Sequence, residues 1–144
     1  MSDNPTEPER EVFALPAEMR DDIIAHARLD APRECCGIIA GRGGIPFHLY
    51  RTTNVAPGNS LYEISPEELI DLEFRQMPAA GTELVAIYHS HPVSEAYPSP
   101  TDRELAFWPD AVYLICSLRD PERPQIRGFR LQDGEVAELN LVIQ

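Results

Sequence analysis

The sequence contains no lysine: all 12 of its basic residues are arginine, against 24 acidic residues in a chain of 144. Two explanations stay open for the missing lysine, GC-rich coding and an acid-biased, salt-adapted proteome, and we favour the second. The formal net charge of -12 repels nucleic acid phosphates and anionic membrane surfaces. The charge balance therefore predicts a protein that binds neither nucleic acid nor membrane.

Long apolar runs and an N-terminal leader are also missing. No stretch approaches the roughly 20 apolar residues of a transmembrane helix, and the first residues are acidic and polar, whereas a signal peptide is basic and then apolar. Cysteine is scarce: there are three, and Cys35 and Cys36 are adjacent, which argues against a secreted disulfide scaffold. These absences predict a soluble, cytoplasmic protein.

The length predicts one domain with a single core. Residues 1–12 are polar, acidic and proline-containing, which predicts a disordered lead-in to a domain over residues 13–144. Helical spacing and capping signals predict helices over 16–29, over 66–77, and from Pro100 to near Trp108. Short apolar runs predict strands over 33–41, 45–51, 84–88, 111–117, 126–131 and 135–142. This order of elements predicts an α/β fold with a mixed β-sheet flanked by helices.

One short stretch, from His89 to Asp102, concentrates the polar chemistry. The predicted strand 84–88 ends at His89 and His91, whose side chains share a face because strand side chains alternate with period two. Ser99 is the N-cap of the predicted third helix, and Asp102 falls in its first turn. Two histidines at a strand end and an aspartate at a helix start predict three ligands for one zinc ion.

A zinc ion on three protein ligands keeps a position for a water molecule and lowers its pKa toward neutrality. A hydrolase also needs a general base and a group that stabilises an oxyanion, and Glu34 and Ser99 are the candidates. Each feature alone has a simpler explanation. Two histidines at a strand end can be incidental, and Ser99 and Asp102 can be capping residues only.

Taken together, these residues resemble the JAMM (MPN-plus) metalloprotease family. The stretch from His89 to Asp102 follows the zinc motif of that family, which is His-x-His, seven residues, Ser, two residues and Asp. The segment from Glu34 to Gly37 matches its glutamate motif. The resemblance extends from the first predicted helix through the strand 111–117.

The resemblance implies a role for each residue of the site. His89, His91 and Asp102 are the implied zinc ligands. Glu34 is the implied general base, which acts on the zinc-bound water, and Ser99 is the implied hydrogen-bond donor to the developing oxyanion. The implied fold is a mixed sheet between helices, similar to that of the cytidine deaminases.

Members of that family hydrolyse the peptide or isopeptide bond after the C-terminal glycine of ubiquitin or a ubiquitin-like protein. Their prokaryotic relatives process small sulfur-carrier proteins of the same fold. The chain after Asp102 is short, so it resembles the minimal prokaryotic type rather than the larger eukaryotic deubiquitinases. The resemblance therefore implies, as partner, a ubiquitin-like or sulfur-carrier protein with a C-terminal Gly-Gly tail. The sequence does not indicate the oligomeric state.

Two other interpretations stay open. A cupin-like protein would bind its metal through His89, His91 and Glu95, but cupins are all-β and this chain carries three helix signals. A non-catalytic MPN-type binding module would have lost the metal ligands, whereas every ligand position is filled here. A cytidine deaminase is disfavoured because neither His-x-Glu nor Pro-Cys-x-x-Cys occurs in the sequence.

Overall fold

The structure, a computed structural model, describes residues 10–144, so most of the predicted lead-in, residues 1–12, lies outside the described residues. Val12, the last residue of that segment, begins strand β1. The helical elements are α1 (Ala17–Asp30), α2 (Pro66–Asp71), the π-helix η1 (Leu72–Gln76), α3 (Met77–Ala80) and α4 (Pro100–Glu104). The strands are β1 (Val12–Leu15), β2 (Cys36–Arg42), β3 (Ile45–Thr52), β4 (Glu83–His91), β5 (Val112–Ser117), β6 (Gln125–Gln132), β7 (Glu135–Glu138) and β8 (Asn140–Ile143).

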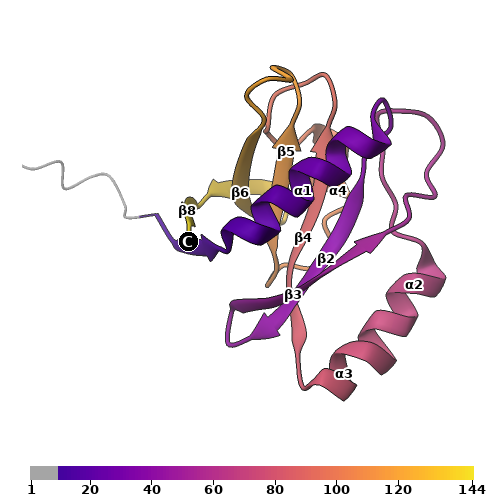
Figure 1. The fold of residues 1–144 in the computed structure, drawn as a ribbon, viewed down its shortest axis with the longest axis vertical. Coiled ribbons are helices and arrows are strands. Elements are labelled where there is room, and N and C mark those ends of the chain that lie inside the picture. Colours follow the sequence, from indigo (N-terminus) through magenta and orange to yellow (C-terminus); the bar gives the residue numbers. More distant parts are fainter. Residues whose placement is uncertain (1–9) are drawn as a thin grey trace, which may run out of the picture.

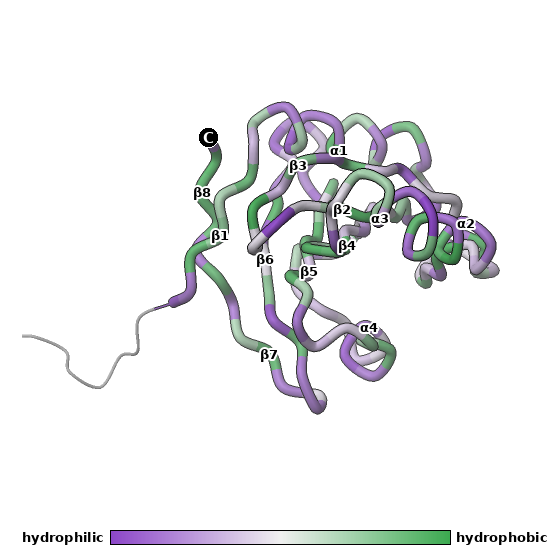
Figure 2. Tube along the Cα trace, turned by 90° about the horizontal axis from the view of Figure 1, so that it is seen from below, coloured by the Kyte–Doolittle hydropathy of each residue, from purple (hydrophilic) through white to green (hydrophobic). Residues whose placement is uncertain are grey.

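Six of the strands form one mixed sheet in the order β3-β2-β4-β5-β6-β7. Strands β4 and β5 pair in parallel, and the other neighbouring pairs are antiparallel. Helix α1 crosses one face of this sheet (Figure 1), and a view turned by 90° places α4 on the opposite side (Figure 2). The predicted α/β class, a mixed sheet flanked by helices, is confirmed.

The side chains of β4 divide between the two faces of the sheet. Tyr88 packs in the apolar cluster that includes Ile23 of α1. Ile87 packs in a second cluster that includes Leu72 of η1. Because side chains alternate along a strand, His89 follows Ile87 onto the face away from α1.

Gly37 of β2 allows the Tyr88 ring to lie against its neighbouring strand. A Cβ atom at position 37 would lie 2.2–2.4 Å from atoms of the Tyr88 ring and its hydroxyl, which is closer than any real contact. The Tyr88 hydroxyl lies 2.7 Å from Nδ1 of His26, and Nε2 of His26 lies 3.3 Å from the Asp30 carboxylate. With Asp30 accepting from Nε2–H, Nδ1 accepts from the Tyr88 hydroxyl, and this buried polar chain ties α1 to the sheet.

Two helices differ in length from their predictions. The helix predicted over 66–77 continues to Ala80 through a π-helical turn, and Gly81, with a φ of 69°, ends it in the left-handed conformation. The helix predicted from Pro100 to near Trp108 ends at Glu104. The Trp108 N–H donates to the Tyr113 hydroxyl at 3.1 Å instead of continuing a helical ladder.

The last predicted strand, 135–142, is divided into β7 and β8. Between them, the Leu139 N–H donates to the Gly128 carbonyl of β6 at 2.8 Å, and the chain then leaves the sheet. Strand β8 pairs in parallel with β1 and forms a second, two-stranded sheet. No helix within residues 10–144 combines the length and the apolar character that crossing a lipid bilayer requires.

Candidate metal centre

His89 and His91 stand at the end of β4 on the face away from α1, as strand alternation predicts. Their Nε2 atoms lie 3.1 Å apart. The Nδ1–H of His91 donates to the Glu95 carbonyl oxygen at 2.8 Å, which leaves Nε2 with the lone pair that a metal needs. Burial lowers the pKa of His89, so its ring stays neutral, which is the form in which imidazole binds metals.

Helix α4 brings Asp102 to the two histidines through a capping box. The Asp102 N–H donates to Oγ of Ser99 at 3.0 Å, and the Ser99 N–H donates to Oδ2 of Asp102 at 2.9 Å. The same Oδ2 lies 3.2 Å from Nε2 of His89 and 3.1 Å from Nε2 of His91. Burial would raise the pKa of Asp102, but the closeness of both imidazoles and the hydrogen bond from the Ser99 N–H outweigh it and hold that pKa below its usual range.

The three ligand-type atoms of His89, His91 and Asp102 converge on one point. They are separated by 3.1–3.2 Å, close to the roughly 3.3 Å between neighbouring ligand atoms of a tetrahedral site with bonds of about 2.0–2.1 Å. Two facing nitrogens and one shared oxygen compete for the same hydrogen bonds, whereas one cation can bind all three. The donor set and its spacing therefore fit a metal site.

Glu34 lies just before β2 at the ligand end of the sheet, because the register pairs Cys36 with His89. Its side chain is buried, and its Oε1 has no hydrogen-bond partner among residues 10–144. Burial raises the pKa of Glu34 to about 7, with the charge of His91 opposing the shift and that of Asp102 adding to it. A carboxyl group with a pKa near neutrality can both accept and return a proton.

Two buried polar side chains hold the backbone on either side of Glu34. Oγ of Ser90 accepts from the Cys35 N–H at 2.8 Å, and the Ser90 N–H donates to the Cys35 carbonyl at 3.1 Å. Nδ2 of Asn54 donates to the Glu34 carbonyl at 2.9 Å and to the Leu61 carbonyl at 3.0 Å. These bonds attach the Glu34 segment to the histidine-bearing strand on one side and to the loop after β3 on the other.

Sequence spacing predicts neither Ser90 nor Asn54 as part of the site. Their bonding partners stand 55 and 20 residues away along the chain, and neither side chain belongs to a motif of its own. Tyr62 is a third residue without a sequence signal. Its ring stacks on His89 with 4.3 Å between the ring centroids. The one available clue is that Asn54 and Tyr62 flank the Pro- and Gly-containing loop that follows β3.

Ser99 is half-buried at the start of α4, directly beside Asp102. Its Oγ accepts the capping hydrogen bond, and its own O–H is not donated to any group among residues 10–144. A hydroxyl has one donor and two acceptor lone pairs, so Ser99 can cap the helix and still donate to another oxygen. Glu95, the third ligand of the cupin-like alternative, presents its backbone carbonyl to His91, and its side chain is exposed.

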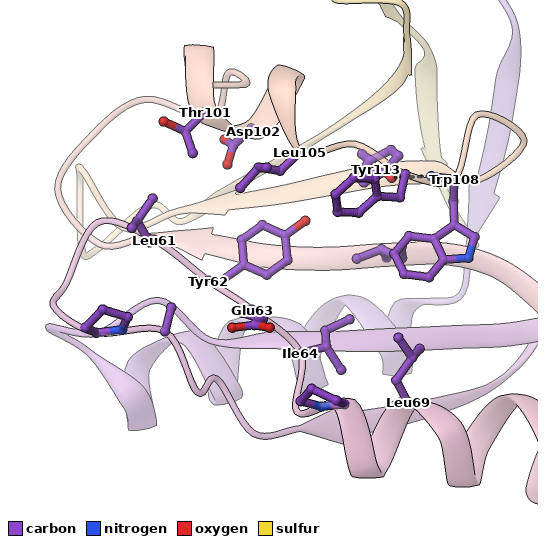
Figure 3. A pocket seen from close by; sticks show the side chains of 15 residues that line it. Leu61, Tyr62, Glu63, Ile64, Leu69, Thr101, Asp102, Leu105, Trp108 and Tyr113 are labelled. Carbon is purple, nitrogen blue, oxygen red and sulfur yellow. Dashed lines mark hydrogen bonds between the residues drawn. The ribbon is translucent and has the colours of Figure 1, made fainter.

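An apolar groove of about 430 Å³ begins at Asp102. In Figure 3, Asp102 and Leu105 lie along one side of it, Ile64 and Leu69 along the other, and Tyr62 between them. The remaining lining residues are Ala56, Pro57, Leu61, Glu63, Pro66, Ile87, Thr101, Phe107, Trp108 and Tyr113. The groove offers an extended apolar surface next to the candidate metal ligand Asp102.

A second cavity, of about 470 Å³, contains Glu34 in its wall and is mainly polar. None of the three metal-ligand residues lines it. The lining residues are His26, Leu29, Asp30, Arg33, Glu34, Thr52, Thr53 and Asn54. The groove and the cavity share no lining residue: the groove includes the candidate ligand Asp102, and the cavity includes Glu34.

Comparison with known proteins identifies relatives over nearly the whole chain. Residues 16–132 match the family described as prokaryotic homologs of the JAB domain. The CysO-cysteine peptidase of Mycobacterium tuberculosis is 40% identical over 137 residues, covering 92% of this chain and 93% of the relative. The desampylase of Haloferax volcanii is 42% identical over 112 residues, covering 73% of this chain and 80% of the relative.

The fold also has a close counterpart among solved structures. The solution structure of a protein from Desulfitobacterium hafniense superposes with a TM-score of 0.83 at 29% sequence identity. The superposition covers 92% of each chain, so the mixed sheet and its helices occur together in a second protein.

Proposed function

The chain belongs to the family of prokaryotic homologs of the JAB domain, and from this premise we propose that it is a zinc-dependent peptidase or isopeptidase. Its substrate would be the bond after the C-terminal glycine of a ubiquitin-like or sulfur-carrier protein. One observation carries the proposal: three metal-ligand atoms of His89, His91 and Asp102 converge beside the buried, unpartnered carboxyl of Glu34. A site built only for stability would leave neither feature in place.

Zinc is the metal that we propose for this site, held by His89, His91 and Asp102. Two neutral imidazoles and one carboxylate are a donor set typical of catalytic zinc. When bound, the ion would act as a Lewis acid and lower the pKa of the attacking water. The hydrogen bond from Nδ1 of His91 to the Glu95 carbonyl supports this role, because it fixes the ring and its tautomer.

The residues of this chain divide the remaining work. Glu34 would accept a proton from the attacking water at its carboxyl oxygen and deliver it to the leaving nitrogen. The C–N bond breaks, the hydroxyl of the water stays on the carbonyl carbon, and the released amine takes the proton. The free O–H of Ser99 would donate to the oxyanion as it develops. The near-neutral pKa of Glu34 supports both proton transfers.

The groove and the relatives support the substrate class. A Gly-Gly tail is narrow, and the groove that starts at Asp102 could bind such a tail in extended form. Of the two relatives, one is named as a peptidase of CysO-cysteine and the other as a desampylase. The further identification of the partner as a ubiquitin-like or sulfur-carrier protein rests on the family resemblance of the motifs.

We also propose that residues 13–144 act as one domain in the cytoplasm. The pairing of β1 with β8 supports a single unit, because it joins the two ends of the described chain. Three unpaired thiols, all buried, support a reducing compartment.

The decisive experiment incubates zinc-loaded protein with ubiquitin-like proteins of the host that carry C-terminal extensions. Mass spectrometry of the products should show cleavage directly after the glycine at the end of the tail. Glu34→Gln should keep stoichiometric zinc and lose cleavage, because glutamine cannot take the proton. Glu18→Gln is the matched control, since Glu18 is exposed in the first turn of α1.

Three results would contradict the proposal. They are the absence of zinc from carefully purified protein, full activity in Glu34→Gln, and cleavage of none of the extended carriers. The last result, with zinc bound, would favour the non-catalytic binding module instead.

A further inference from the structure

The two histidines of the candidate metal centre are held in different ways. The Nδ1–H of His91 donates to the Glu95 carbonyl oxygen at 2.8 Å, which fixes the plane of its ring. Nδ1 of His89 has no hydrogen-bond partner within residues 10–144, although the side chain is buried. The outer torsion of a histidine side chain has broad minima, so a ring without such a bond can turn and carry Nε2 away from the other ligand atoms. Another contact must therefore fix the His89 ring.

The ring of Tyr62 lies flat against His89. The two ring centroids are 4.3 Å apart, and the angle between the ring planes is 18°. Rotation of the imidazole about its Cβ–Cγ bond would drive one edge of the His89 ring into the Tyr62 ring. The stack therefore restricts the plane of the one candidate ligand ring that lacks a hydrogen bond at its other nitrogen.

Tyr62 is itself held in place by the buried side chain of Asn54. Nδ2 of Asn54 donates to the Leu61 carbonyl at 3.0 Å, and the Glu63 N–H donates to Oδ1 of Asn54 at 3.0 Å. One amide group thus fixes the backbone on both sides of Tyr62. Because the same Nδ2 also donates to the Glu34 carbonyl, the loop that carries Tyr62 is attached to the segment of the proposed base.

The hydroxyl of Tyr62 takes no part in the stack. In Figure 3 it points across the groove toward the side of Leu105, and it forms no hydrogen bond to any of the described groove residues. The flat face of the ring is therefore the part of Tyr62 that meets His89. Phenylalanine would keep that face, whereas an aliphatic side chain would not.

We propose that Tyr62 is a positioning residue for metal binding, whose ring holds the His89 imidazole in the plane that directs Nε2 at the shared metal position. The stack does for His89 what the hydrogen bond to Glu95 does for His91. The inference rests on the proposed zinc site and adds to it a residue that sets the affinity for the ion without binding it.

Zinc affinity, measured by competition with a chromophoric chelator, tests the proposal without a substrate. Tyr62→Leu should weaken zinc binding by about tenfold or more, the usual effect of losing a group that orients a ligand. Tyr62→Phe should stay within about twofold of the wild type, because the ring remains. Tyr50→Leu is the matched control and should also change little: the Tyr50 ring lies 4.3 Å from that of His48, which is not a candidate ligand.

Two further measurements separate positioning from a general loss of stability. At saturating Co²⁺, the visible absorption bands, which report the geometry around the ion, should change in Tyr62→Leu and return in Tyr62→Phe. Lower stability alone would not move these bands. Nuclear Overhauser contacts between the ring protons of Tyr62 and His89 in metal-free wild-type protein test the stack even if Tyr62→Leu does not fold.

Several results would overturn the inference and leave the proposed zinc site intact. They are equal zinc affinity in wild type and Tyr62→Leu, an affinity of Tyr62→Phe as low as that of Tyr62→Leu, unchanged cobalt bands, and no contact between the two rings in the metal-free protein. A rise in KM of Tyr62→Leu with unchanged zinc affinity would likewise confine Tyr62 to the groove wall. Failure of the wild type to bind zinc would overturn the proposed function and this inference with it.

Discussion

The two faces of strand β4 bury polar side chains in different ways. Toward α1, His26 is 4% exposed and both ring nitrogens have partners, the Tyr88 hydroxyl and the Asp30 carboxylate. Toward the groove, His89 is 1% exposed and its Nδ1 has no partner within residues 10–144, and the same holds for Oε1 of Glu34. Leaving a buried polar atom unpaired costs about 1–3 kcal/mol. The paired polar groups on the α1 face therefore add stability, whereas the unpaired atoms of His89 and Glu34 reduce it.

The largest effect is expected from His89→Ala on the groove face. Removing one of the three proposed ligands should prevent binding of the proposed zinc ion and lower kcat/KM by at least about a thousandfold. Metal analysis and cleavage assays measure both effects. His48→Ala is the control, because His48 is exposed on β3. If the His89 variant kept stoichiometric zinc, His89 would not be a metal ligand, and the proposed difference in role between the two faces would be wrong.

On the opposite face, His26→Ala should reduce stability and leave the metal in place. The change leaves the buried Tyr88 hydroxyl without its acceptor and opens a cavity, so we expect a loss of about 2–4 kcal/mol in the free energy of unfolding. Urea titration measures this loss, and metal analysis should still find one zinc ion. The double variant His26→Ala/Tyr88→Phe should lose less free energy of unfolding than the sum of the losses of the two single variants, because it leaves no unpaired hydroxyl.

Ser90→Ala tests a side chain that lies on the α1 face of β4 but should affect the site on the other face. Its hydroxyl points away from the groove, yet it holds the Cys35 N–H and so the backbone beside Glu34. We expect a loss of about 1–3 kcal/mol in stability and a fall in kcat of about tenfold with little change in KM, since a small misplacement of the base slows the chemical step. Ser60→Ala, at an exposed position, is the control. An unchanged kcat would confine Ser90 to a structural role.

The smallest effect is a gain in stability from Glu34→Gln in the metal-free protein. Burial raises the pKa of folded Glu34 to about 7 from the ordinary value of 4.5, so the folded chain holds this proton more tightly than the unfolded chain. The stabilising contribution of protonated Glu34 is complete at pH 4 and is lost as the pH rises through 7. Glutamine stays neutral, so the variant should exceed the wild type by about 1–2 kcal/mol at pH 8. Thermal unfolding at pH 8 and pH 4 measures the difference, which should vanish at the lower pH.

Local rules predicted most of the elements and the three side chains that meet at the candidate metal site. His89 and His91 follow from alternation on one strand, and Ser99 and Asp102 follow from capping at one helix start. Each of these signals lies within a few residues. The position of Glu34 beside them depends on the pairing of β2 with β4, for which the resemblance to a family, and no spacing rule, provided the expectation.

The unpredicted parts depend on contacts between distant segments. The division of the last strand follows from a single hydrogen bond between Leu139 and Gly128, after which β8 meets β1 at the other end of the chain. Helix α4 ends at Glu104, and farther along the predicted helix the Trp108 N–H donates to the Tyr113 hydroxyl. The sequence does not distinguish Asn54 from other loop asparagines. Its role follows from its hydrogen bonds to the Glu34 and Leu61 carbonyls, which only the structure shows.

The contact between Gly37 and Tyr88 links substitutions at two positions. Any side chain at 37 would occupy the space of the Tyr88 ring and would push its hydroxyl away from His26. A smaller residue at 88 would make room for alanine at 37 but would also end the polar chain to α1. Positions 26, 37 and 88 should therefore vary as a group, and in a library that randomises them together, accepted sequences should show covariation rather than independent tolerance.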